Sequence, residues 1–527
     1  KRILLSIIIA FNLLMIIGCN SQKEYVLTEL NLTSQYIDDN YRTYYEIFVG
    51  TFSDSNEDGI GDINGLTNRL DYLNDGDLNS GKSLGVTGIW LMPIMPSNSY
   101  HKYDVKDYMS IDPNYGTIDD FKVFLAEAKE RNIDVIIDLV VNHTSKYHPW
   151  FKAFSKAVSE GDTSNPYYHY YSLYTEETKT TNKTFYSFYD GYFYEGNFSS
   201  EMPELNLDNI DVRNEFKDII KYWLDLGVSG FRLDAAKYIY LDEQDKNIEF
   251  WNWFMEETRK INEDVYVVGE VWSSNKELTP YYESFSNFDF QMSGQGGWVA
   301  STAIGYETVN RYVEYLNDYR DEVFSINENA ILTPFISNHD MNRAAGFLTG
   351  GARYSAANLY LLTYGTPFIY YGEEIGMKGL RGSENTDANR RLAMLWGDND
   401  TVEDPVGSTY DASLQTNGTV KSQISDPTSL YNHYKKLLMI RNAYPEISRG
   451  IYEPLLFTGH QTFGGFKTTY NKSTLGVFHN TSDTSITIDF NQYDLYFDQL
   501  LVYAGQGIAS FDDNQLTIEA YTSVILK

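Results

Sequence analysis

Charged side chains follow one another closely in residues 230–238, where Arg232, Asp234 and Lys237 lie within six positions. The residues before them, 228–233, are mostly apolar and predict a short buried strand. A guanidinium next to a carboxylate favours the ionised carboxylate, so we expect Arg232 to keep Asp234 charged. A strand that ends in such charges indicates a reactive site rather than a purely structural element.

Other buried strands along the chain also end in polar side chains. Apolar runs separated by helical segments occur at residues 44–49, 85–94, 135–141, 228–233, 265–270, near 288, 330–336 and 366–371. Eight such runs indicate an α/β fold with a closed parallel (β/α)8 TIM barrel rather than an open sheet. In such a barrel the reactive groups lie at the C-terminal ends of the strands. That rule brings together His143, Asp234, Glu270, His339 and Asp340, with Arg232.

The chain of 527 residues is too long for one core, and the pattern divides it into several parts. The predicted barrel takes residues 36–143 and 209–446. Residues 144–208 are irregular and rich in Tyr, Ser, Thr and Asn, which indicates a domain inserted after the third strand. Residues 447–527 lose the helical period and alternate Thr, Tyr, Phe and Ile, which predicts a C-terminal antiparallel β-domain.

The N-terminal segment has the layout of an export signal. Lys1 and Arg2 precede about fifteen mostly apolar residues, which is too short for a comfortable membrane span. The run closes at Gly18-Cys19-Asn20 and resembles a bacterial lipobox, so residues 1–19 are interpreted as a lipoprotein signal peptide with Cys19 as the acylated residue. An ordinary signal peptide or membrane anchor with an incidental cysteine is the alternative. We expect a polar tether at residues 20–35 and a chain exported to the extracellular face of a bacterial membrane and lipid-anchored there.

Composition narrows the class of partner. The formal net charge of −32, from 41 Lys and Arg against 73 Asp and Glu, disfavours nucleic acid. The 45 Tyr and 8 Trp suit a neutral ligand with apolar faces and many hydroxyls. With one cysteine no intrachain disulfide can form. We expect a monomer that meets the membrane only through its lipid.

Oxygen-bearing side chains alternate in the loop at residues 54–62, after the first strand. Alternate oxygen donors with Gly at the sharp turns are typical of a loop around Ca²⁺. The predicted ligand set is Asp54, Asn56, Asp58, Ile60 and Asp62. Because Gly65 stands where an EF-hand has Glu, the loop is of another kind. An Asx-rich turn without an ion is the alternative.

Taken together, these motifs make the chain, from about residue 40, similar to the α-amylase family of glycoside hydrolases. The family's four main motifs are matched by residues 138–143 (DLVVNH), 230–238 (GFRLDAAKY), 269–272 (GEVW) and 335–340 (FISNHD), in that order. Two lesser ones are matched by residues 202–206 (MPELN) and by 365–373. Together these motifs are specific, whereas any one alone would be weak.

The resemblance implies roles for the residues that match. Asp234 would be the nucleophile, Glu270 the general acid/base and Asp340 the carboxylate that stabilises the transition state. Substrate would be held by Tyr103, Asp104, His143 and His339 on the non-reducing side and by Lys237 on the other, and Arg232 is also expected among the substrate-binding residues. The calcium loop recurs in family members, and a further calcium site in many of them uses Asn142 with an Asp where this chain has Glu204.

The resemblance also bears on the bond that is cleaved. Ala235 and Lys237 resemble enzymes that cut α-1,4 bonds, which favours a retaining α-amylase acting on starch or maltodextrins. An exo-acting α-glucosidase or a 4-α-glucanotransferase is the first alternative, since a sugar can replace water as acceptor. A non-catalytic surface glycan-binding lipoprotein is the second, and it predicts the loss of Asp234, Glu270 or Asp340. All three are present.

Overall fold

The computed structural model describes residues 25–27, 32–383 and 386–527 of the chain. Cys19 and the predicted signal peptide lie outside these residues. Within the described part no helix is both long enough and apolar enough to cross a bilayer.

Parallel strands form the centre of the molecule. They are β1 (Tyr44–Ile47), β2 (Gly88–Leu91), β3 (Asp134–Leu139), β6 (Gly230–Leu233), β7 (Tyr266–Gly269), β8 (Ser286–Asn287) and β9 (Phe368–Tyr370). The hydrogen-bonded order is β8-β7-β6-β3-β2-β1-β9. β3, β6 and β7 are therefore neighbours, and the residues that follow them lie at one edge of the curled sheet. The fold is an α/β fold consistent with a TIM barrel, as the sequence predicts.

One predicted strand is not regular. Residues 330–336 form only two isolated parallel bridges, Phe288 to Thr333 and Phe335 to Phe368, which close the ring between β8 and β9. Pro334 stands between the two bridging residues and has no N–H to donate to a neighbouring strand. The prediction of a regular seventh strand was therefore wrong, although the segment occupies the predicted place in the ring.

Amphipathic helices connect and cover the strands. In α5 (Ile210–Leu226) the residues Val212, Phe216 and Trp223 are fully buried, and the helix ends at Gly227 in the left-handed conformation with φ 108°. Thr117 begins α3 (Ile118–Glu130) with a capping box. The other helices of the barrel region are α1 (Ile63–Asn68), α2 (Leu70–Leu73), α6 (Gln244–Arg259), α7 (Asn275–Leu278), α8 (Trp298–Ala303), α9 (Val309–Ile326), α10 (Ala352–Leu361), α11 (Val420–Gln423), α12 (Leu430–Ala443) and α13 (Pro445–Arg449).

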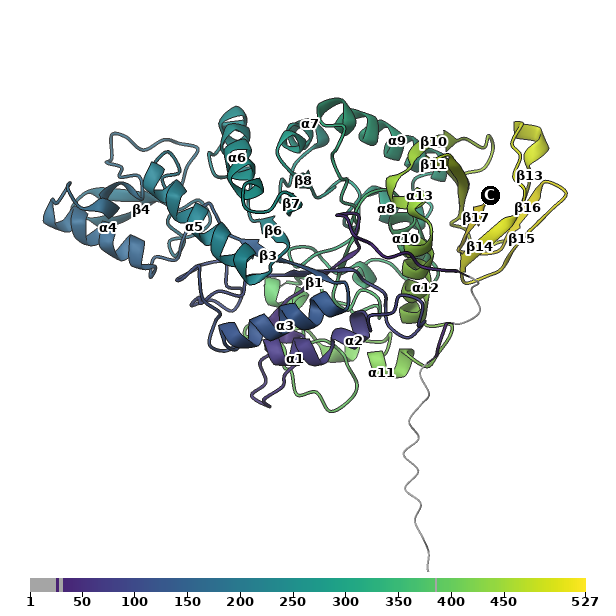
Figure 1. Ribbon diagram of the computed structural model, residues 1–527, viewed down its shortest axis with the longest axis horizontal. Coiled ribbons are helices and arrows are strands. Elements are labelled where there is room, and N and C mark those ends of the chain that lie inside the picture. Colours follow the sequence, from purple (N-terminus) through teal and green to yellow (C-terminus); the bar gives the residue numbers. More distant parts are fainter. Residues whose placement is uncertain (1–24, 28–31, 384–385) are drawn as a thin grey trace, which may run out of the picture.

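Two further parts flank the barrel at opposite ends of the view in Figure 1. Between β3 and β6 the chain forms α4 (Pro149–Glu160) and the hairpin β4 (Phe185–Tyr189) and β5 (Tyr192–Glu195). After α13 it forms two antiparallel sheets. Their strands are β10 (Ile451–Leu455), β11 (Phe463–Tyr470), β12 (Ser473–Asn480), β13 (Ile486–Asp489), β14 (Leu500–Gly505), β15 (Ala509–Asp512), β16 (Gln515–Ile518) and β17 (Thr522–Leu526). The C-terminal β-structure is thus confirmed.

The predicted tether begins to pack on the barrel earlier than expected. The N–H of Tyr25 donates to the carbonyl of Ile424, and the N–H of Leu27 to that of Gly81. Leu27 and Ser34 are buried. The prediction of a free polar tether over residues 20–35 is therefore wrong for its described part, because apolar side chains within it are covered by the barrel.

Candidate active site

The strand β6 delivers two charged side chains from a closely packed backbone. A Cβ on Gly230 would lie 1.7 Å from the carbonyl oxygen of Tyr266, so only glycine lets β6 approach β7. Arg232 follows two positions on and is 1 % exposed, with its guanidinium 5.2 Å from the ring centre of Trp90. Asp234 comes directly after the strand and lines the cleft described below.

Three carboxylates share the guanidinium of Arg232. Nη1 lies 3.0 Å from Asp138 Oδ1 and 2.8 Å from Asp234 Oδ1, and Nη2 lies 2.8 Å from Glu270 Oε2. Asp138 belongs to the first matched motif but was not predicted as a site residue. One cation therefore holds the predicted nucleophile and the predicted acid/base close to each other.

This sharing corrects the expectation for Asp234. Burial raises the pKa of Asp234, and the attraction of Arg232 offsets only part of that rise. Burial likewise raises the pKa of Glu270, and it raises the pKa of Asp138 to about 7. We expected Arg232 to favour an ionised Asp234 alone, but its charge is divided among three acids. Burial therefore opposes ionisation of all three carboxylates, and the charge of Arg232 counters that effect at each of them.

The backbone directly after Asp234, the predicted nucleophile, orients Glu270. Ala235 has φ 48°, in the left-handed region that non-glycine residues rarely adopt. Its N–H donates to Glu270 Oε2 over 3.0 Å. The oxygen Oε2 is thus held by Ala235 and Arg232, whereas none of the described residues donates to Oε1. Backbone strain of this kind is typical of functional sites, and here it fixes one oxygen of Glu270 and leaves the other for substrate.

Asp340 lies between two cations. Its Oδ1 is 2.7 Å from Arg391 Nη2 and its Oδ2 is 2.8 Å from His339 Nε2. Burial acts to raise the pKa of Asp340, but the charges of His339 and Arg391 hold it well below its usual range. Burial acts to lower the pKa of His339, but Asp340 and Glu46 raise it to about 9. Asp340 is therefore an anion and His339 a cation at neutral pH.

The remaining predicted substrate residues occupy three places. The hydroxyl of Tyr103 donates to Asp138 Oδ2 over 3.1 Å and lies 2.8 Å from His339 Nε2. His143 is buried beside it with Nε2 unpaired, and burial lowers its pKa to about 4. Asp104 accepts from Ser97 and Ser99 and is buried. Lys237 donates to the carbonyl of Trp272 over 2.8 Å, at the edge of the site.

A cleft of about 730 Å³ brings these groups together. It is lined by Tyr100, His101, Tyr103, His143, Phe198, Ser199, Met202, Asp234, Ala235, Tyr238, Glu270, Trp272, Asp340, Asp387 and Arg391. Phe198 and Trp272 are 45 % and 44 % exposed, so apolar faces remain open to a ligand at its walls. The three predicted catalytic carboxylates, with Tyr103 and His143, line this cleft. Asp104, Arg232, Lys237 and His339 do not line it but contact or adjoin residues that do.

Besides Asp138, sequence reasoning missed two further charged residues of the site. Arg391 lies in a loop after Asp387–Arg390, away from any strand end, and carried no signal. Glu46 lies inside β1, where its Oε1 is 2.6 Å from His339 Nδ1. A charged residue within an otherwise apolar strand is a signal that could have identified Glu46, because buried carboxylates are nearly always paired.

The loop at residues 54–62 has the donors that Ca²⁺ prefers, all of them oxygen. The carboxylate of Asp54 accepts from the N–H groups of Asn56, Glu57 and Gly59, and Asp62 accepts from Ser55 and Gly65. Among the described residues no three His, Cys, Asp or Glu side chains are grouped as metal ligands. The donor chemistry fits, and the calcium set of Asp54, Asn56, Asp58, Ile60 and Asp62 stays a prediction.

The resemblance places a second calcium site at Asn142 and Glu204. Part of the negative charge near these residues is neutralised by a lysine of the chain itself. Asn142 Oδ1 is buried without a partner, and burial beside Glu195 raises the pKa of Glu204 to about 8. Lys183 Nζ lies 3.0 Å from Glu195 Oε2. The side chain of Lys183 thus already balances the charge of one of the two acids, Glu195.

We expect Glu46→Gln to flatten the loss of stability at alkaline pH. The pKa of His339 in the folded state, about 9, exceeds the usual 6.5. The protonated imidazole therefore contributes fully to the free energy of unfolding below pH 6.5, and this contribution is lost as the pH rises through 9. Removing the charge of Glu46 lowers that pKa and cuts the contribution by about 1 to 3 kcal/mol. Urea unfolding of both proteins from pH 6 to 9.5 checks this. If the free energy of unfolding fell with pH along parallel curves in the two proteins, this role of Glu46 would be contradicted.

Comparisons with known proteins agree with this geometry. The family model described as the catalytic domain of α-amylase matches residues 46–450. "Alpha-amylase 3" of Dictyoglomus thermophilum is 38 % identical over 496 residues, covering 92 % of each chain. A 4-alpha-glucanotransferase of Thermotoga maritima is 31 % identical over 84 % of this chain and 97 % of its own. The solved structure of Eubacterium rectale Amy13B is 37 % identical with a TM-score of 0.87, covering 94 % of this chain and 97 % of that one.

The match begins within β1, covers the other strands of the barrel and includes every carboxylate of the cleft. The chain therefore belongs to the α-amylase family of glycoside hydrolases and is an enzyme that acts on α-glucans.

Proposed function

We propose that the enzyme hydrolyses α-1,4-glucosidic bonds of starch and maltodextrins with retention of configuration. The observation that carries this is the pair Asp234 and Glu270 on opposite nitrogens of one guanidinium. A retaining enzyme needs its two carboxylates close together, at roughly 5 to 5.5 Å, so that one can attack while the other protonates the departing oxygen.

The proposed reaction has two steps. Asp234 attacks the anomeric carbon while Glu270 gives its proton to the oxygen of the leaving sugar, which breaks the glycosidic bond and forms a glycosyl ester. Glu270, now ionised, takes a proton from water, and the hydroxide displaces Asp234. Asp340, held as an anion by His339 and Arg391, stabilises the positive charge that develops on the sugar ring.

Two measurements on one digest test this function. With maltoheptaose as substrate, NMR of the first products should show the α-anomer, and chromatography should show a mixture of internal cleavage products. Net formation of the β-anomer would contradict a covalent step on Asp234. Glucose as the sole product would instead support exo-acting α-glucosidase action.

Transfer to a sugar is the second candidate, favoured by the 31 % identity to a 4-alpha-glucanotransferase. The same glycosyl ester can be captured by a sugar hydroxyl in place of water. A transferase would convert maltoheptaose to longer and shorter chains with little increase in reducing ends. A hydrolase would increase the reducing ends steadily.

We also propose that Ca²⁺ binds the loop at residues 54–62, where it would order the loop without entering the reaction. Removal of the ion by EDTA is expected to lower Tm by a few degrees and to be reversed by added Ca²⁺ but not Mg²⁺, which dehydrates reluctantly. Asp58→Asn should shrink the shift, whereas the exposed Asp119→Asn should leave it. An EDTA shift of the same size in both variants would contradict this loop as the site.

We also propose that the chain is exported and anchored to the membrane by a lipid on Cys19. Labelled palmitate should be incorporated into the full chain in a bacterial host and not into Cys19→Ser. Equal incorporation into both would contradict lipidation at this cysteine.

A further inference from the structure

Two polar side chains of α6 reach the loop that joins β6 to this helix. Asn247 and Trp251 are four positions apart, which places them on one face of the helix. Both are buried, so their polar atoms need partners within the protein. They find most of these partners among the backbone groups of residues 236–240.

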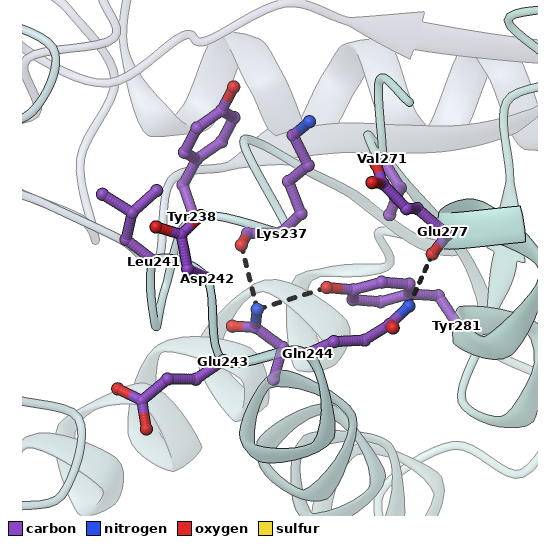
Figure 2. A pocket seen from close by; sticks show the side chains of 10 residues that line it. Lys237, Tyr238, Leu241, Asp242, Glu243, Gln244, Val271, Glu277 and Tyr281 are labelled. Carbon is purple, nitrogen blue, oxygen red and sulfur yellow. Dashed lines mark hydrogen bonds between the residues drawn. The ribbon is translucent and has the colours of Figure 1, made fainter. Parts of the chain in front are cut away.

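Asn247 binds the loop with both polar atoms of its amide. Its Oδ1 accepts from the N–H of Tyr240 over 2.9 Å. Its Nδ2 donates to the carbonyl of Lys237 over 2.9 Å and to that of Tyr240 over 3.1 Å. In Figure 2 dashed lines join the Lys237 carbonyl and the Tyr281 hydroxyl to this same nitrogen, which lies 3.2 Å from the hydroxyl. One amide therefore fixes the loop at two residues and ties it to the segment after β7.

Trp251 holds the residue before Lys237. Its Nε1 donates to the carbonyl of Ala236 over 2.8 Å. Phe285 packs edge-on against the indole with 5.5 Å between ring centres, which keeps the ring in place. The carbonyls of two consecutive residues, Ala236 and Lys237, are thus both held by α6.

These two residues directly follow Ala235, whose N–H donates to Glu270 Oε2. The N–H of Ala236 also donates to the main-chain carbonyl of Glu270 over 3.0 Å. The turn is therefore bound to Glu270 on one side and to α6 on the other. The left-handed conformation of Ala235 is unfavourable for a residue with a Cβ and persists only where the surrounding structure imposes it. The contacts from α6 impose it, because they fix the backbone directly after Ala235.

Asp234, by contrast, is held by groups outside α6. Its N–H donates to the carbonyl of Leu139 over 3.2 Å, and its Oδ1 lies 2.8 Å from Arg232 Nη1. A change in α6 is therefore expected to disturb the orientation of Glu270 and to leave the predicted nucleophile in place.

We propose that Asn247 and Trp251 are positioning residues for the general acid/base. They fix the carbonyls after Ala235, keep its N–H aimed at Glu270 Oε2, and so present the other oxygen of Glu270 to the leaving sugar. The inference rests on the proposed function, because it takes Glu270 as the acid/base. It assigns a part in the reaction to two residues that lie outside the matched motifs.

Two substrates separate the orientation of Glu270 from folding. Formation of the glycosyl ester from maltoheptaose needs a proton from Glu270, whereas α-maltosyl fluoride loses fluoride without one, and kcat/KM reports this step for both. Asn247→Ala is expected to lower kcat/KM for maltoheptaose about 10 to 100-fold, because a misplacement of about 1 Å can cost 10²-fold. It should leave kcat/KM for α-maltosyl fluoride within about twofold. The kcat for the fluoride should fall, because Glu270 still acts as the base in the second step.

A second variant and a control come from the same helix. Trp251→Phe removes the indole N–H and keeps a ring, and it should show the same difference between the substrates. It supplies the comparison if Asn247→Ala does not fold. Asn252→Ala is the matched control, because the Asn252 side chain bonds to Glu283 and Ser284 rather than to the loop after β6. It should change neither kcat/KM by more than about twofold.

The outcomes are distinct. Equal losses on both substrates, or no loss on either, would overturn the inference and leave the proposed function intact. A loss confined to maltoheptaose in Asn252→Ala as well would also overturn it. No turnover of either substrate by the unmodified enzyme would overturn the proposed function and the inference with it.

Discussion

Glu270→Gln is expected to lower kcat on maltoheptaose by roughly 10² to 10⁴-fold, the usual contribution of a positioned general acid and base. The amide can still accept from Ala235, but it has no proton to give to the leaving oxygen. With α-maltosyl fluoride the first step needs no acid, so the glycosyl ester should form and then accumulate, because no base activates water. Stopped-flow release of fluoride is expected to show a burst of one equivalent per enzyme, followed by a slow steady rate.

The control for this experiment is Glu263→Gln, an exposed glutamate in the turn before β7. It should retain the activity of the unmodified enzyme on both substrates. The assignment of Glu270 would be contradicted if Glu270→Gln lost the fluoride burst together with the maltoheptaose activity. That result would place Glu270 in the first attack rather than in proton transfer.

The sequence could predict those site residues that directly follow a strand. Asp234 and Glu270 follow short apolar runs, and parallel strands bring their C-terminal ends to one edge. The structure places both side chains on one arginine.

Residues held by tertiary contacts could not be predicted in the same way. Arg391 reaches Asp340 from a loop whose local sequence has no period. The loss of a regular strand around Pro334 depends on one missing donor, which matters only once its neighbours β8 and β9 are known. The docking of Leu27 depends on a surface near Gly81 that is built by distant segments. Local patterns carry no information about such partners.

Only the structure shows that Arg232 shares its positive charge among three carboxylates. Spacing in the sequence pairs Arg232 with Asp234 because they are two residues apart. The fold adds Asp138 from β3 and Glu270 after β7 to the same guanidinium. Arg232 is thus the cation that neutralises the whole buried group of carboxylates, and not the partner of Asp234 alone.

Arg232→Met is therefore expected to destabilise the protein by about 3 to 5 kcal/mol at pH 8, in addition to abolishing activity, because it leaves buried carboxylates without a cation. Without Arg232 the folded pKa values of Asp138, Asp234 and Glu270 rise further above those of the unfolded chain. The folded state then binds more protons than the unfolded state, so stability falls as the pH rises. The destabilisation should accordingly be smaller at pH 5 than at pH 8, as measured by urea unfolding.

Arg441→Met provides the comparison that separates charge from packing. Arg441 is also a buried arginine, but it donates to the backbone carbonyls of Leu361, Thr363 and Gly365. Its loss leaves unpaired carbonyls, whose cost does not depend on carboxylate protonation, so the destabilisation should be similar at pH 5 and pH 8. The same pH dependence in both variants would contradict the view that Arg232 acts by neutralising the three acids. A dependence confined to Arg232→Met would mean that the charge balance that holds Asp234 and Glu270 ready for reaction also holds this end of the barrel together.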